Sequence, residues 1–99
     1  MDGRADWGAL RTRRMAEPGA QGAYEAARLA FELGRSVREL REQHGWSQSE
    51  LARQTGMTQS AVARFEAGGT VPTLPVLERL ARALGAELAV TFSPRAVAA

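Results

Sequence analysis

The sequence predicts an all-α fold of five or six helices that ends in one short β-strand. Three observations predict it: apolar residues recur at helical spacing, Gly and Pro residues separate the periodic stretches, and only residues 88–92 alternate like a strand. The length of 99 residues and the 44% apolar content indicate one small globular domain. We expect an N-terminal helical extension (1–22), a central domain (23–85) and a C-terminal strand and tail (86–99).

The first expected helix is short and contains Trp7, Leu10 and Met15, and Pro18-Gly19 ends it. A long helix follows from about residue 20 to residue 44. Its expected core stripe has helical spacing and consists of Ala26, Leu29, Leu33, Val37, Leu40 and His44. Gly34 interrupts this stripe, so a bend there is possible.

The first half of the long helix also has a second apolar face, which contains Tyr24 and Phe31. A chain of this size rarely leaves such aromatic residues uncovered. Either the helix around Trp7 and Leu10 folds back onto this face, or a partner protein or a second subunit covers it.

Three short helices are expected next, over residues 48–55, 59–67 and 74–84. Each follows a residue type that caps helix N-termini, namely Ser47, Thr58 and Thr73. Each is followed by glycine, which most easily adopts the left-handed conformation that ends a helix. Ser47 and Glu50 have the spacing of a reciprocal capping box.

A single strand is expected at Leu88, Val90 and Phe92, because these residues alternate with less apolar ones before Ser93-Pro94. A lone strand leaves its backbone groups unpaired, and no other segment has this pattern. The simplest arrangement is a homodimer in which two copies of the strand pair about a two-fold axis. The alternatives are a frayed tail and a further helical turn.

Composition excludes several classes of function. The chain has no cysteine and one histidine, His44, so we expect no enzyme, no metal and no cofactor. No apolar run reaches about 20 residues and no secretory signal pattern opens the chain, so we expect a cytoplasmic protein without membrane contact. Thirteen arginines against eleven acidic residues give a net charge of only +2, without a block of like charge. Charge alone therefore does not identify a nucleic-acid binder.

The helices at 48–55 and 59–67 are joined by the tight turn Thr55-Gly56-Met57-Thr58, which predicts a helix-turn-helix. The face of the second helix that points away from Val62 and Phe65 carries Gln59, Ser60, Ala63 and Arg64. Gln suits adenine, Arg suits guanine, and an Ala methyl group can contact thymine. The alternative is an ordinary solvated helix surface.

The segment LREQHGWSQSELARQTGMTQSAVARFEAGGTVPTLPVLERLARALG resembles the helix-turn-helix domain of Cro/C1-type (XRE-family) transcription regulators, which have a lambda-repressor-like fold. The resemblance implies binding to double-stranded operator DNA. It implies that Gln48 contacts a phosphate, that Gln59, Ser60, Ala63 and Arg64 face the bases, and that Thr70 contacts the backbone. We add Thr58 to this surface.

The same resemblance implies an ion pair between Arg41 and Glu66, largely buried, that joins the long helix to the recognition helix. The alternative is two unrelated surface charges.

The flanking segments AYEAARLAFELG and ALGAELAVTFSP make the chain similar to HigA-type antitoxins, small repressors encoded beside a RelE/HigB-type ribonuclease toxin. This resemblance implies two functions, repression at an operator near its own gene and neutralisation of the toxin. Trp7, Leu10, Tyr24 and Phe31 then become the expected toxin-docking surface. The alternatives are a stand-alone phage-type repressor and a protein-interaction module that has lost DNA binding.

Overall fold

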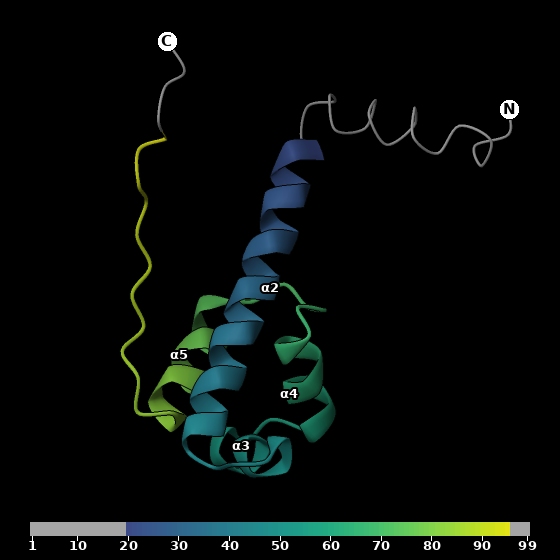
Figure 1. Cartoon of the computed structure of the whole chain (residues 1–99), viewed down its shortest axis with the longest axis vertical. Coiled ribbons are helices and arrows are strands. Elements are labelled where there is room, and N and C mark those ends of the chain that lie inside the picture. The colour runs from purple at the N-terminus through teal and green to yellow at the C-terminus, as the bar shows by residue number, and fades with distance from the viewer. Residues whose placement is uncertain (1–19, 96–99) are drawn as a thin grey trace, which may run out of the picture.

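The computed structural model describes residues 20–95, which form four helices and an extended C-terminal segment (Figure 1). The helices are α2 (Ala20–Gln43), α3 (Gln48–Thr55), α4 (Gln59–Glu66) and α5 (Leu74–Ala83). The three short helices gather around the C-terminal part of α2, whereas the N-terminal part of α2 projects beyond them. None of these helices has the length and apolar character that a membrane crossing requires.

The predicted starts of the three short helices are confirmed by their caps. In each case a side-chain hydroxyl accepts a hydrogen bond from the backbone N–H three residues later, at Ser47 (3.0 Å), Thr58 (3.0 Å) and Thr73 (3.4 Å). Gly56 ends α3 in the left-handed conformation, with a φ of 72°. The capping box is only half formed, because the Glu50 carboxylate bonds to Arg53 and Gln54 on its own helix.

The core lies where α3, α4 and α5 meet the second half of α2. Its most completely buried side chains are Leu51 on α3, Val62 on α4 and Leu80 on α5. One buried residue of α2, Val37, belongs to the same cluster. Burial of these apolar side chains is what holds three short helices together, since each would be marginal in isolation.

The buried face of α2 differs from the predicted stripe. Val37 is buried as predicted, and Leu33 and Leu40 pack against the core. However, Ala30 and Gly34 are buried, whereas the predicted Ala26 is exposed and Leu29 is 50% exposed. The helix continues without interruption through Gly34. The difference arises because α4 packs against Gly34 and thereby sets which side of α2 faces inward.

Gly34 lets the backbones of α2 and α4 touch. A Cβ atom at this position would lie 2.3 Å from the carbonyl oxygen of Phe65 and 2.7 Å from that of Glu66, far closer than real contacts allow. Gly68, two residues beyond the end of α4, makes a similar approach to the backbone of Phe31 and has a φ of 76°. Two glycines, one on each segment, therefore fix the distance between α2 and the end of α4.

Two architectural predictions are not supported. Residues 20–95 contain four helices rather than five or six, and the predicted helix around Trp7 and Leu10 lies outside the described residues. The same residues contain no strand: the segment around Leu88, Val90 and Phe92 is extended but unpaired. A strand needs a partner for its backbone hydrogen bonds, and residues 20–95 of one copy contain only one such segment.

Candidate nucleic-acid interface

Helices α3 and α4 form the predicted helix-turn-helix pair, with Gly56 at the turn. Helix α4 is strongly two-sided, because Val62, Phe65 and Glu66 are buried toward the core and α2. Its opposite side faces away from the rest of the molecule and is available to a ligand.

The outward side of α4 carries the residues that were expected to face DNA bases. Gln59, Ser60 and Arg64 are exposed, and Ala63 is half-buried between them. Arg64 has no ion pair or side-chain hydrogen bond with any residue in the range 20–95. Two of these four side chains, Ser60 and Ala63, are short, so a ligand surface can approach the α4 backbone closely between Gln59 and Arg64. The guanidinium donors of Arg64 are not used within residues 20–95.

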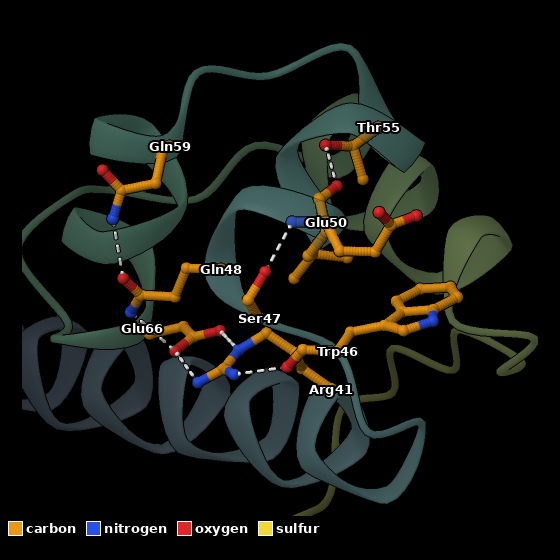
Figure 2. Close-up of polar contacts among 9 residues, drawn as sticks. Arg41, Trp46, Ser47, Gln48, Glu50, Thr55, Gln59 and Glu66 are labelled. Atoms are coloured by element: carbon orange, nitrogen blue, oxygen red, sulfur yellow. Dashed lines mark hydrogen bonds and ion pairs between the residues drawn. The ribbon is translucent and has the colours of Figure 1, made fainter.

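A partly buried ion pair fixes the inner side of α4 to α2 (Figure 2). Arg41 grips the Glu66 carboxylate with two nitrogens, Nε at 2.6 Å from Oε2 and Nη2 at 3.0 Å from Oε1. Its remaining terminal nitrogen, Nη1, donates to the carbonyl oxygen of Trp46 at 2.8 Å. The side chains of Arg41 and Glu66 are only 12% and 3% exposed. The hydrogen bond to Glu66 raises the pKa of Arg41, so the guanidinium stays charged.

This ion pair continues outward through two glutamine amides. Gln48 Nε2 donates to Glu66 Oε1 at 3.1 Å, and Gln59 Nε2 donates to Gln48 Oε1 at 2.9 Å. Figure 2 shows the four side chains as one connected row from α2 to the first residue of α4. The row thus links the last residue of α4 to the first residues of both α3 and α4.

The ion pair also sets which way each amide points. A carboxylate can only accept, so Gln48 must turn its NH₂ group to Glu66 and its oxygen to Gln59. Gln59 must then use its NH₂ group toward Gln48, and its own oxygen has no hydrogen-bond partner within residues 20–95. A buried pair of fixed charges therefore orients an acceptor at the outer surface, together with the second N–H of the same amide.

The remaining predicted residues of this surface lie nearby but have other contacts. Thr58 caps α4, so its oxygen is engaged by the Ala61 N–H. Thr70 is half-buried and lines a pocket with Arg64 and the exposed Val71.

The residues that were expected to bind protein partners lie elsewhere. Tyr24 and Phe31 are 52% and 57% exposed on α2, and Trp7 and Leu10 lie outside the described residues. Among the residues expected to form a dimer, Leu88 is half-buried, Val90 is 62% exposed and Phe92 is fully exposed.

Sequence reasoning missed the importance of Gly34, which sets the position of α4 from behind. The available signal was its place one helical turn before Val37 and two turns before Arg41, on the same side of the helix. It also missed a contact of His44, whose Nε2 lies 2.7 Å from the Leu84 carbonyl oxygen while its ring stacks on Trp46. This contact ties the end of α2 to the end of α5. Between residues 20 and 95, no cluster of three potential metal-binding side chains is present.

A family model described as "Helix-turn-helix" (HTH_3) matches residues 37–90, which is more than half of the chain. The matched region starts within α2, covers α3, α4 and α5, and ends within the extended segment. No curated protein and no solved structure matches.

Proposed function

Because the chain belongs to the helix-turn-helix (HTH_3) family and is a DNA-binding transcription regulator of the XRE type, we propose that it is a sequence-specific repressor without enzymatic activity. We propose further that it binds an operator as a homodimer and serves as the antitoxin of a HigB/RelE-type toxin. The observation that carries the proposal is the outward side of α4, where Gln59, Ser60 and Arg64 are exposed opposite a fully packed inner side.

The chemistry of this side fits the floor of the DNA major groove. Gln59 offers an oriented oxygen and a spare N–H, the pair of groups that reads the N6 and N7 edge of adenine. Arg64 offers the planar fork that reads guanine, and Ala63 offers a methyl group for contact with thymine. The spare N–H of Gln48, at the start of α3, is placed for a phosphate at that helix N-terminus.

In the proposed homodimer, each DNA site is contacted by two copies of a chain whose own net charge is low. Two copies of α4, related by a two-fold axis, would read half-sites about 34–36 Å apart. Each contacted phosphate releases counterions, so affinity should fall as salt rises even though the net charge is only +2.

The test of DNA binding is a gel shift with the DNA upstream of the gene, performed at two salt concentrations. We expect Arg64→Ala to lose about 1–3 kcal/mol of binding free energy and to relax the preference at one base pair. Arg79→Ala, which removes an exposed arginine of α5, is the matched control and should bind normally. An equal loss on all DNA sequences would assign Arg64 to phosphate, and no shift by the unaltered chain would reject the repressor function.

The antitoxin proposal is supported by two exposed aromatic residues on one face of α2. Tyr24 and Phe31 are 52% and 57% exposed there, and both lie outside the region of the family match. Exposed apolar residues grouped on one element are typical of a protein interface. The surface is separate from the outward side of α4, so toxin and DNA would contact different parts of the chain.

Phe31→Asp tests this docking surface. We expect the variant to lose protection against the toxin in a growth assay with the toxin gene next to this one, and to keep its gel shift. Ser36→Asp places the same charge at an exposed α2 position and should retain both functions. If Phe31→Asp lost DNA binding as well, Phe31 would be needed for folding rather than for toxin binding. If the variant still protected against the toxin, Phe31 would not belong to the docking surface.

A further inference from the structure

We propose that the extended segment at the C-terminus of one copy pairs antiparallel with that of a second copy, centred on Val90, and that Phe92 of each copy enters an apolar groove of the other. This inference rests on the homodimer proposed above and specifies its interface. The groove, here called the α5 groove, is lined by Leu74, Pro75, Glu78, Leu88 and Val90.

The backbone of this segment is extended and unpaired. Residues 87–95 form no backbone hydrogen bond with any part of the chain that the structure describes. The N–H and C=O groups of the segment are therefore free, as in the edge of a sheet. Among residues 20–95, a second copy of the same segment is the one available backbone partner, because the helices of this range have no free backbone edge.

The apolar side chains of the segment lie on the side that faces α5, but α5 does not cover all of them. Leu88 packs against the core and Val90 lines the α5 groove, so the even-numbered residues of the segment face α5. Phe92 continues this side by alternation but is 100% exposed, because it lies beyond the residues of α5 that line the groove. Leu74, on the other wall of the groove, is 62% exposed. The chain thus presents an uncovered phenyl ring and an unfilled apolar groove.

Antiparallel pairing centred on Val90 brings these two features together. Residues opposite each other then have numbers that sum to 180, so Phe92 lies opposite Leu88 of the second copy, at the α5 groove. Val90 lies opposite itself, and all three apolar pairs share one face of the ribbon. On the other face, Glu87 becomes the diagonal neighbour of Arg95 of the second copy, a favourable pair of charges.

Phe92→Ser tests the insertion, measured by sedimentation of the full chain over a range of concentrations. We expect the dimer dissociation constant to rise on the order of 10- to 100-fold, since each dimer loses two buried rings. The melting temperature of the monomer should not change, because the Phe92 side chain is fully exposed and packs against no other residue in the range 20–95. Phe31→Ser removes another exposed phenyl ring and is the matched control, which should leave the dissociation constant unchanged. Equal effects of both substitutions would overturn the insertion.

A cysteine scan tests the register, and the chain has no cysteine of its own. Val90→Cys places two thiols opposite each other on the axis, within disulfide reach, so mild oxidation should cross-link nearly all of the dimer. Ala89→Cys alone should cross-link poorly, because residue 89 lies opposite residue 91 of the second copy. A mixture of Ala89→Cys and Thr91→Cys chains should cross-link to each other. Efficient cross-linking of Ala89→Cys with none at Val90→Cys would reject this register.

The sedimentation and gel-shift results separate this inference from the proposed function. If the dimer shows the expected effects of Phe92→Ser and Val90→Cys but does not shift DNA, the proposed interface stands and the proposed repressor function is rejected. A chain that shifts DNA but stays monomeric at micromolar concentration, or dimerises with no effect of Phe92→Ser, would reject the interface alone.

Discussion

The two halves of α2 are stabilised in different ways although they form one continuous helix. In residues 20–29 the polar contacts are local: Arg28 pairs with Glu25 at 3.1 Å and with Glu32 at 2.7 Å, and all three side chains are at least 35% exposed. In residues 30–43 the decisive contacts reach another helix, because Gly34 touches the α4 backbone and Arg41 pairs with Glu66.

This difference shows that the kind of contact matters more than the number of contacts. Exposed pairs three or four residues apart contribute a few tenths of a kcal/mol each, since water and salt screen them. Breaking a buried pair leaves a charge without a partner in a poorly solvated site, which costs about 3–5 kcal/mol. We therefore expect the two halves to respond very differently to equivalent substitutions.

The largest effect is expected for Arg41→Ala, which leaves the 3%-exposed Glu66 carboxylate without its cationic partner. The free energy of unfolding should fall by about 3–5 kcal/mol, and the melting temperature by more than about 10 °C. Arg38→Ala removes an exposed arginine one turn earlier and is the matched control. Thermal unfolding followed by circular dichroism measures both. Equal melting temperatures for the two variants would show that the ion pair does not stabilise the fold.

An intermediate effect is expected for Gly34→Ala, which adds a methyl group against two backbone oxygens of α4 that cannot rotate away. We expect a loss of about 1–3 kcal/mol in stability despite the better helix propensity of alanine. Gly22→Ala, in the exposed half, meets nothing within 4 Å and should instead gain up to about 1 kcal/mol. Urea unfolding measures the change in the free energy of unfolding for both variants, and we expect the two changes to have opposite signs. A stabilised Gly34→Ala would contradict the close approach.

A small effect is expected for Arg28→Ala, which removes the exposed arginine that pairs with both Glu25 and Glu32. The loss should be about 0.5 kcal/mol or less and should shrink further in high salt. Chemical denaturation at two salt concentrations gives the measurement. A loss comparable to that of Arg41→Ala would mean that the projecting half of α2 is buried in solution.

The smallest effect concerns the exposed carboxylate of Glu50. Hydrogen bonds from Arg53 and Gln54 lower its pKa from the ordinary value of 4.5. A lowered pKa in the folded state stabilises the fold above pH 4.5, and this contribution is lost as the pH falls through the lowered value. NMR titration should show the Glu50 pKa rising toward 4.5 in Arg53→Ala. An unchanged pKa would mean that Arg53 does not hold this carboxylate.

The sequence predicted the features that depend on neighbours along the chain. Ser47, Thr58 and Thr73 cap the helices that follow them, because capping requires a hydroxyl and a nearby N–H. The outward placement of Gln59 and Arg64 also followed from helical periodicity around Val62 and Phe65.

Features that depend on segments far apart in the chain could not be predicted from the sequence in this way. Leu29 has the spacing of a core residue but is exposed, because α4 and α5 do not extend along the first half of α2. Alternation at Leu88, Val90 and Phe92 describes a preference of one segment, whereas a strand requires two. The outward direction of the Gln59 oxygen depends on a chain of contacts that starts at Arg41 on another helix.

The missing side chain at Gly34 makes the tilt of α4 depend on a contact on its inner side. Helix α4 rests its carbonyl groups directly on α2 at this point, opposite its outward side. A substitution behind the helix would change the angle at which every outward side chain is presented. For the proposed repressor, the preferred DNA sequence would then change although Gln59, Ser60, Ala63 and Arg64 remain the same.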